Sequence, residues 1–518
     1  MLIVGAVTMA TVGAGAPTPP GTAGPVWGEC AMAPQPGVER DPRQQCATLK
    51  VPLDYRAPRG RTIEITISRV ATAQAATRRG ILLSNPGGPG DQGLDLPSAL
   101  AGVLPPEVLE RYDLVGFDPR GVGNSTPVTC GIDPATPRSQ VLPYPAPDGD
   151  IRGDVAFART TAAACAEHSG DVLRFITTAN TARDMDRIRA ALGERKVSYY
   201  GTSYGTYLGA VYLSLFPGRS DRFVLDSAAD PNLVWRDMFR TWSEAVALRL
   251  PDLLAFAAER DAVYHLGATP DEVRRTYDRL TSALDERPLP NPGGPELDGN
   301  ALREVTRWLL YFDFALPTLA GVWQEVAEAV STGSAVDGAG ALSAGGLTVG
   351  GLAGAAGVPA DNQVAALYAV VCGDAAWPRD VALYARDVAG DRRAWPLTAG
   401  MPSNFWTCAA WPTRPIEPPV TVSDHGPRNV LILQNTRDPS TSLRAARGMR
   451  AALGRRAVMI TVDQGGHGVF GLGSCADEAT NTFLATGALP ARDRFCPAPA
   501  GDALRSSAGP YVTPAWPF

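Results

Sequence analysis

The sequence predicts a mostly parallel β-sheet flanked by helices, with a large helical insertion before the last strands. Short apolar runs that suit buried strands alternate with loops and helical segments, which is the pattern of a parallel sheet covered by helices. This alternation stops near residue 231 and returns near residue 429. At 518 residues the chain also exceeds one ordinary domain, so a core with an inserted domain fits its length.

The expected strands and helices each follow from a local pattern of apolar residues. Residues 63–70 alternate apolar and polar side chains, as a half-buried strand does, and residues 183–192 show helical apolar spacing. The Pro- and Gly-rich residues 17–60 are expected to wrap over the core. The expected strands are 63–70, 81–84, 112–117, 197–200, 222–225, 429–433 and 457–462, and the expected core helices are 183–192 and 205–216.

The insertion is expected to form a helical cap. Residues 235–260 and 271–286 suit helices, whereas the Gly/Ala/Ser-rich segment 333–358 suits a flexible loop. The predicted division is a leader at 1–28, the first part of the core at 29–230, the cap at 231–400 and the second part of the core at 401–518.

Composition argues against several classes of protein. The apolar share of 45% and the charged share of 19% suit a globular enzyme rather than a disordered chain. The formal net charge of −6, without a dense basic run, argues against nucleic acid as a partner. No stretch after the leader reaches about 18 uninterrupted apolar residues, so we expect no stable membrane span.

The leader and the cysteines favour export. Residues 2–12 are apolar and small, and residues 13–16 resemble the cleavage site of a signal peptide, although no basic residue precedes them. The eight cysteines form no Cys-x-x-Cys motif. They fall into sequence neighbours, Cys30/Cys46, Cys130/Cys165, Cys372/Cys408 and Cys475/Cys496. Disulfides closing these loops fit a secreted protein or one of the bacterial cell envelope; scattered buried thiols are the alternative, and spacing alone does not fix the pairing.

The motif that carries the chemistry is Gly201-Thr202-Ser203-Tyr204-Gly205, which matches G-x-S-x-G. In that motif the serine sits on a strained turn between a strand and a helix, so the residues two before and two after it must be small. A strand is expected before Ser203 and an apolar helix after it, so the sequence context agrees. We therefore predict that Ser203 is a nucleophile.

A serine nucleophile needs a base and an acid to orient that base. His467 lies in a Gly-rich loop after a predicted strand, whereas His168 precedes the nucleophile, His265 lies in the cap and His425 precedes the strand expected to carry the acid. Asp438 follows the strand at 429–433 and precedes His467 by 29 residues. Asp424 and Asp463 are less well placed, the first before that strand and the second too close to His467. We predict Asp438 as the acid, with helix capping as the alternative.

An oxyanion hole needs two backbone N–H donors. The residue after the nucleophile, Tyr204, supplies one, and the loop Pro86–Gly90 after an early strand supplies the other. We predict Gly88 as that donor, with Gly87 as the second choice; a simple turn is the alternative.

The motifs together resemble those of the secreted tripeptidyl aminopeptidases, which are similar to the proline iminopeptidases among the α/β-hydrolases. The resemblance rests on residues 85–90, 116–125 and 201–206 with the late Asp438 and His467, and it is weakest across the cap. It implies an α/β-hydrolase fold, release of short peptides from a free N-terminus, and a cap that limits access. It also implies that Asp118 and Arg120 stabilise loops near the site rather than react.

The expected function is that of a secreted serine exopeptidase that acts through an acyl-enzyme, without a metal or organic cofactor. Its partner is a peptide or a small ester, because a carboxylesterase or lipase would use the same residues; a catalytically inactive exported binding protein is the remaining alternative. An aminopeptidase must also bind an ammonium group. Asp226, Asp230 and Glu244 are candidates for that role, each with a capping or surface role as the alternative.

Overall fold

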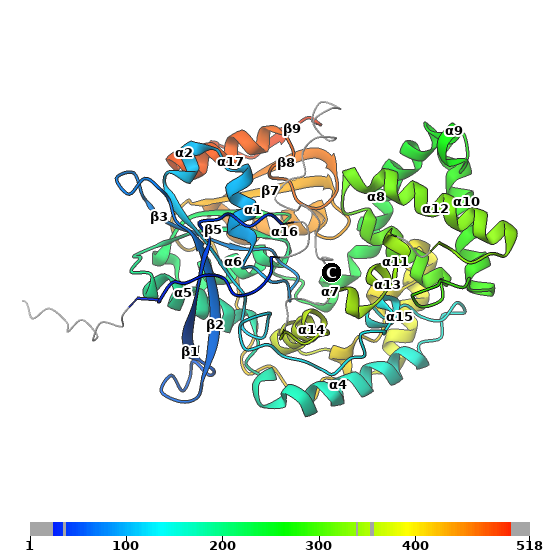
Figure 1. Cartoon of the computed structure of the whole chain (residues 1–518), viewed down its shortest axis with the longest axis horizontal. Coiled ribbons are helices and arrows are strands. Elements are labelled where there is room, and N and C mark those ends of the chain that lie inside the picture. The colour runs from blue at the N-terminus through cyan, green and yellow to red at the C-terminus, as the bar shows by residue number, and fades with distance from the viewer. Residues whose placement is uncertain (1–23, 35–37, 338–339, 353–356, 499–518) are drawn as a thin grey trace, which may run out of the picture.

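A nine-stranded sheet, in the order β1-β2-β4-β3-β5-β6-β7-β8-β9, forms the centre of the protein (Figure 1). The computed structural model describes residues 24–34, 38–337, 340–352 and 357–498. Strand β2 runs antiparallel to β1 and β4, and the other neighbours pair in parallel, so the sheet is mostly parallel, as the sequence predicts. The strands are β1 Gln45–Pro52, β2 Thr62–Val70, β3 Gly80–Asn85, β4 Tyr112–Phe117, β5 Val197–Thr202, β6 Ser220–Asp226, β7 Val430–Arg437, β8 Ala457–Gly465 and β9 Arg494–Cys496.

Helices cover both faces of this sheet. Successive side chains of a strand point to opposite faces, and the central strands carry apolar side chains on both. Tyr199 of β5 packs in the same apolar cluster as side chains of α5, α6 and α16. The next residue, Tyr200, packs in a second cluster with side chains of α1 and α17. The helices outside the segment between β6 and β7 are α1 Leu96–Val103, α2 Pro106–Leu109, α3 Arg138–Val141, α4 Arg152–Leu173, α5 Thr178–Ala191, α6 Tyr204–Leu215, α16 Leu443–Leu453 and α17 Cys475–Thr486.

The chain between β6 and β7 forms a helical region on the right of Figure 1. Helices α8, α10, α11 and α12 share an apolar cluster of their own, in which Tyr277 and Trp323 stack 4.5 Å apart. A capping box at Thr269 and Glu272 begins α10. In contrast, α14 packs in the cluster that also contains β5 and α6. The helices of this region are α7 Arg236–Arg240, α8 Trp242–Ala258, α9 Asp261–Tyr264, α10 Pro270–Glu286, α11 Gly299–Leu309, α12 Leu316–Thr332, α13 Ala344–Leu347, α14 Asn362–Asp374 and α15 Val381–Ala394.

The structure differs from the sequence-based expectation at two segments. Within residues 17–60, expected to wrap over the core, Gln45–Pro52 instead forms the edge strand β1. Within the expected loop 333–358, short helices occur and both Leu342 and Val349 are buried, so apolar residues anchor part of it. Residues 338–339 and 353–356 of that segment, and residues 1–23 of the predicted leader, lie outside the described residues.

All eight cysteines form disulfides. The first bonds to the second along the chain, the third to the fourth, the fifth to the sixth and the seventh to the eighth. The expectation of four neighbouring pairs is confirmed, and the alternative of scattered thiols is wrong. The bonds are Cys30–Cys46, Cys130–Cys165, Cys372–Cys408 and Cys475–Cys496.

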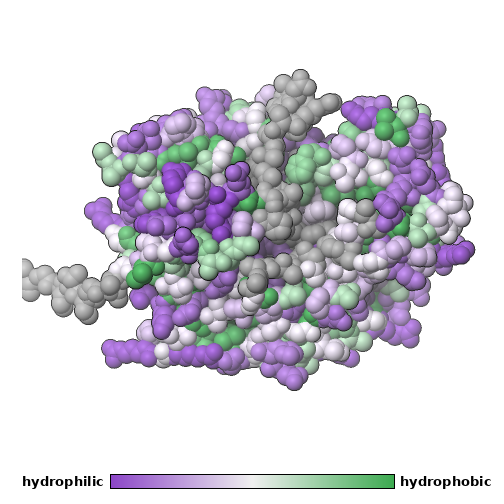
Figure 2. Space-filling view, viewed as in Figure 1, coloured by the Kyte–Doolittle hydropathy of each residue, from purple (hydrophilic) through white to green (hydrophobic). Residues whose placement is uncertain are grey.

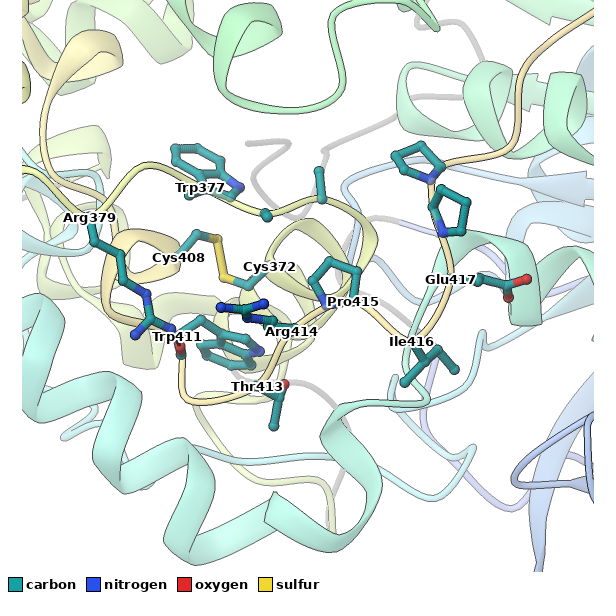
Figure 3. A pocket seen from close by; sticks show the side chains of 14 residues that line it. Cys372, Trp377, Arg379, Cys408, Trp411, Thr413, Arg414, Pro415, Ile416 and Glu417 are labelled. Atoms are coloured by element: carbon teal, nitrogen blue, oxygen red, sulfur yellow. Dashed lines mark hydrogen bonds between the residues drawn. A yellow bond between two sulfur atoms is a disulfide. The ribbon is translucent and has the colours of Figure 1, made fainter.

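The surface seen in Figure 2 mixes hydrophilic and apolar residues over both the sheet half and the helical half. Within the described residues, no helix is both long enough and apolar enough to cross a bilayer. A pocket of about 840 Å³ opens beside the Cys372–Cys408 disulfide, with the indoles of Trp377 and Trp411 in its wall (Figure 3). None of the predicted catalytic residues lines this pocket.

Candidate active site

The predicted catalytic residues all follow strands at their carboxyl ends, which lie along one edge of a parallel sheet. Ser203 follows β5, Asp438 follows β7 and His467 follows β8 by two residues. The loop with Gly87 and Gly88 follows β3, the strand next to β5. The sheet therefore brings residues from four distant parts of the sequence to one edge.

Ser203 occupies the tight turn between β5 and α6. Its backbone has φ 57° and ψ −124°, a strained conformation for a residue with a side chain. The strain is held by a hydrogen bond from its N–H to the carbonyl of Asp226, 3.0 Å away, and by Thr206, whose N–H donates to the Ser203 carbonyl at 2.9 Å. The turn leaves the Ser203 side chain at the N-terminus of α6, where the helix dipole favours negative charge.

Close packing around this turn explains its glycines. A Cβ on Gly201 would lie 2.6 Å from the carbonyl oxygen of Gly205, and one on Gly205 would lie 2.8 Å from the carbonyl oxygen of Asn85. Both distances are shorter than real Cβ contacts, so only glycine fits at either position. The spacing of the motif is thus a steric requirement of the turn.

His467 and Asp438 form a buried pair. The Nδ1 atom of His467 lies 2.9 Å and 3.0 Å from the two carboxylate oxygens of Asp438. Because a carboxylate only accepts, Nδ1 carries the proton, and the lone pair of the neutral ring is on Nε2. That Nε2 atom is buried, and no described group forms a hydrogen bond with it. This is the arrangement that a general base needs, because its acceptor atom is available to a reacting hydroxyl.

Backbone and hydroxyl donors hold the Asp438 carboxylate in place. The N–H groups of Ser440 and Thr441 donate to Oδ1 at 2.8 Å and 2.9 Å. The Thr441 hydroxyl donates to Oδ2 at 3.0 Å and also lies 3.4 Å from Nδ1 of His467. Sequence reasoning did not identify Thr441; its place three residues after the acid, in a turn of Pro, Ser and Thr, was the available signal.

The glycine loop after β3 lies directly against the nucleophile. A Cβ on Gly87 would be 2.9 Å from the Ser203 Cβ and 3.5 Å from the backbone nitrogen of Tyr204. The N–H of Gly87 already donates to the Asn85 side chain at 3.2 Å. The next N–H, that of Gly88, therefore stays the prediction for the second oxyanion donor. Tyr204 is the first residue of α6, and such N–H groups lack an intrahelical acceptor.

Comparison with known proteins bears on the family to which this chain belongs. A family model described as TAP-like protein matches residues 397–496. Tripeptidyl aminopeptidase of Streptomyces coelicolor is 36% identical over 490 residues, which cover 92% of this chain and 86% of that protein. This chain belongs to the tripeptidyl aminopeptidase family. The resemblance inferred from the sequence is confirmed, and with it the α/β-hydrolase fold.

Two further relatives of this chain have other names. Serine protease Hip1 of Mycobacterium tuberculosis is 30% identical over 495 residues, covering 91% of this chain and 90% of that protein. Carboxylesterase B of the same organism is 32% identical over 475 residues, covering 87% and 86%. The chain is therefore a serine hydrolase, as predicted.

In this tripeptidyl aminopeptidase homologue, contacts from the core fix the loop that carries His467. Asp226 accepts hydrogen bonds from the N–H groups of Val469 and Phe470 at 2.9 Å and 3.0 Å. On the other side, the Asn435 side chain donates to the carbonyls of Gly466 and Gly468, at 3.0 Å and 2.8 Å. Burial raises the pKa of Asp226 to about 6, and the hydrogen bonds that it accepts oppose this rise.

The helical region also contacts the His467 loop. The N–H of His467 donates to the carbonyl of Tyr311 at 2.7 Å, and the Tyr311 ring lies edge-on to the imidazole. Arg249 of α8 supports this turn, since its Nε donates to the carbonyl of Leu310 at 3.0 Å. Its guanidinium also pairs with Asp252 and Asp313 and lies against Gly465, where a Cβ would overlap it.

The same cluster reaches the strand that carries the acid. Asp252 pairs with Arg437, the residue before Asp438, at 2.9 Å, and Arg437 pairs with Asp463 at 2.7 Å. Arg249 and Asp252 of the helical region thus contact the residues just before His467 and just before Asp438.

The carboxylates proposed from the sequence as ammonium ligands have other roles in this structure. Asp226 fastens the His467 loop, as described above. Asp230 accepts from the backbone and side-chain nitrogens of Asn232, both at 2.9 Å, and so closes a turn. Glu244 is partly exposed and lies 3.7 Å from Arg444. A turn-closing role thus accounts for Asp230 and a surface role for Glu244, whereas the buried Asp226 has a loop-fastening role that neither alternative describes.

Asp118 and Arg120 have the loop-supporting contacts that the family resemblance implies. Asp118 accepts from the N–H groups of Gly93 and Asn124 at 2.9 Å and 2.8 Å. Arg120 is fully buried and forms a two-pronged pair with Asp184, with both distances 2.7 Å. Both residues hold the loops beside β3 and β4 in place.

Proposed function

We propose that this chain is a serine exopeptidase that releases tripeptides from the free N-termini of its substrates. The observation that carries the proposal is the buried His467–Asp438 pair, with Nε2 of His467 unpartnered at the sheet edge where Ser203 lies on its strained turn. The names of the family relatives, tripeptidyl aminopeptidase and serine protease Hip1, support a peptide as substrate.

The proposed reaction has two half-reactions. His467 Nε2 takes the proton of the Ser203 hydroxyl while the oxygen attacks the scissile carbonyl, and the tetrahedral oxyanion accepts from the N–H groups of Gly88 and Tyr204. The protonated imidazole then donates its proton to the leaving amine as the C–N bond breaks. Water, deprotonated by His467, finally hydrolyses the acyl–Ser203 ester. Asp438 holds the Nδ1–H tautomer throughout and stabilises the imidazolium.

We further propose that residues 231–400 act as a cap that restricts access, and that the chain is exported. Contacts of Tyr311 and Arg249 with the catalytic loops support the first proposal. Four disulfides support the second, because such bonds persist in oxidising compartments.

The proposal is tested with a panel of chromogenic substrates: tripeptide anilides with free and with acetylated N-termini, a proline anilide and short-chain esters. We expect turnover of the free-amine tripeptide anilides, and its loss together with loss of fluorophosphonate labelling in Ser203→Ala. Turnover of esters alone would favour the carboxylesterase function that the name of one relative suggests. Wild-type turnover by Ser203→Ala would overturn the assignment of the nucleophile.

A further inference from the structure

Asp91 directly follows the glycine loop Pro86–Gly90, and its carboxyl group lies against Gly88 of that loop. A Cβ on Gly87 would be 2.9 Å from the Ser203 Cβ, and a Cβ on Gly88 would be 3.3 Å from the carboxyl carbon of Asp91. The loop is fixed against α14, because the α-carbon of Gly90 packs on the backbone of Gln363. Of two adjacent glycines, one is thus close to Ser203 and the other is close to a carboxylate that the proposed reaction does not use.

Among the described residues no cation forms an ion pair with Asp91, and the buried Arg138 guanidinium acts on its carboxylate only from beyond ion-pair distance. Its described hydrogen bond comes from the side-chain amide of Gln363, a neutral donor. Other acids near the catalytic loops are compensated. Glu304 pairs with Arg307, Asp313 pairs with Arg249, and Asp226 accepts backbone N–H groups.

The surroundings of Asp91 favour a cationic ligand. Burial raises the pKa of Asp91 to about 7, and the Gln363 amide, Arg138 and His467 only partly oppose this rise. A carboxylate taken out of water is stable as an anion only when a cation or strong donors compensate it. A ligand with an ammonium group would supply both the charge and three N–H donors.

We propose that the Asp91 carboxylate binds the α-ammonium group of the peptide substrate. This inference rests on the proposed exopeptidase function and assigns the residue that distinguishes a free N-terminus from a blocked one. An extended peptide spans about 3.3 Å per residue. With the scissile carbonyl at Ser203 and the ammonium at Asp91, the distance between these two groups limits how many residues are released.

The test compares Asp91→Asn, which keeps the shape and removes the charge, with the wild-type enzyme. Substrates are a tripeptide anilide with a free N-terminus and its acetylated form, assayed at pH 8. We expect the ratio of the two kcat/KM values to fall by about 10- to 100-fold in Asp91→Asn, mainly through KM for the free amine. Asp91→Glu, which keeps the charge, should restore part of the ratio. Glu244→Gln, a matched loss of a partly exposed carboxylate already beside Arg444, should leave the ratio unchanged.

A binding measurement keeps the test independent of turnover. In the Ser203→Ala background, calorimetric titration with the free tripeptide should show about 10- to 100-fold weaker binding when Asp91 is also replaced by Asn. If the wild-type enzyme prefers free amines and Asp91→Asn keeps both the ratio and the affinity, the Asp91 assignment is wrong and the exopeptidase function stands. If the wild-type enzyme does not distinguish the two substrates, both proposals fail.

Discussion

The backbone N–H of His467 donates to the carbonyl of Tyr311, 2.7 Å away, so a turn of the helical region holds the loop of the catalytic base. The Tyr311 ring packs against the imidazole, with 5.2 Å between ring centres. The Tyr311 hydroxyl accepts from Arg307 at 3.1 Å. Arg249 holds the same turn by donating to the carbonyl of Leu310. Residues outside the sheet core therefore hold the loop of the predicted base.

Replacing Arg249 should therefore slow catalysis. We expect Arg249→Met to lower the rate of fluorophosphonate labelling of Ser203 by about a hundredfold per folded molecule, because a small displacement of the base has an effect of this size. Arg249→Lys should recover part of the rate. The matched control is Arg274→Met, which removes a partly exposed arginine that pairs with Asp278 in α10. A lower melting temperature with an unchanged labelling rate would show that Arg249 is only structural.

A methyl group on Gly87 should block the site. Gly87 has φ +116°, and a Cβ there would lie 2.9 Å from the Ser203 Cβ. We expect Gly87→Ala to lower kcat/KM for the peptide anilide by about 10²- to 10³-fold, because the added Cβ would displace the loop that carries the proposed Gly88 donor, and losing one such donor has an effect of this size. Gly390→Ala is the control, because open space surrounds Gly390 within α15 and alanine favours a helix. Equal activity of the two variants would contradict the proposed oxyanion loop.

Removing the Asp438 charge should leave the fold intact and stop the reaction. Asn at this position cannot enforce the Nδ1–H tautomer of His467, so we expect Asp438→Asn to lower kcat by about 10⁴-fold. Asp463→Asn is the control, because Asp463 is half-exposed and pairs with Arg437 instead. The measurement is steady-state turnover, with circular dichroism to confirm folding. If kcat fell in Asp463→Asn and not in Asp438→Asn, the assignment of Asp438 as the acid would be wrong.

Asp91 should also make stability depend on pH. Burial raises its pKa to about 7, so the folded protein binds this proton more tightly than the unfolded chain does. Ionisation of Asp91 therefore destabilises the fold, increasingly as pH rises from about 4 through 7. We expect Asp91→Asn to raise the free energy of unfolding by roughly 1–3 kcal/mol at pH 8 and by almost nothing at pH 4.

Denaturant unfolding at these two pH values measures the effect. Asp237→Asn, at an exposed aspartate, is the control and should show no such difference. An equal gain at pH 4 and pH 8 for Asp91→Asn would mean that the charge of the carboxylate is not the cause.

The parallel core could be predicted because its signals are local. Val197–Thr202 predicts the strand, and the motif around Ser203 predicts the turn and the start of the helix. All of these signals lie in adjacent residues. Strand β1 was missed because its flanks are rich in Pro and Gly, and its partner β2 decides its conformation. Edge strands of this kind depend on pairing more than on their own pattern.

The same distinction applies to the candidate site. Ser203, Asp438 and His467 could be proposed from chain order and strand ends. The contacts of Tyr311 and Asp91 could not, because they join residues far apart in sequence: His467 to Tyr311, and Asp91 to Gln363, 272 positions away. Asp226 looked available for an ammonium group because a sequence does not show which backbone N–H groups will surround a carboxylate.

The disulfides all join neighbours in the order of the cysteines, with separations of 16, 35, 36 and 21 residues. A chain that enters an oxidising space from its N-terminus therefore presents each cysteine together with its own partner before the next pair arrives. Oxidation in order of appearance yields the native set directly, so maturation places little demand on thiol–disulfide exchange. In an exported chain, three of the four cross-links could therefore form before Asp438 and His467 arrive, and only Cys475–Cys496 follows them.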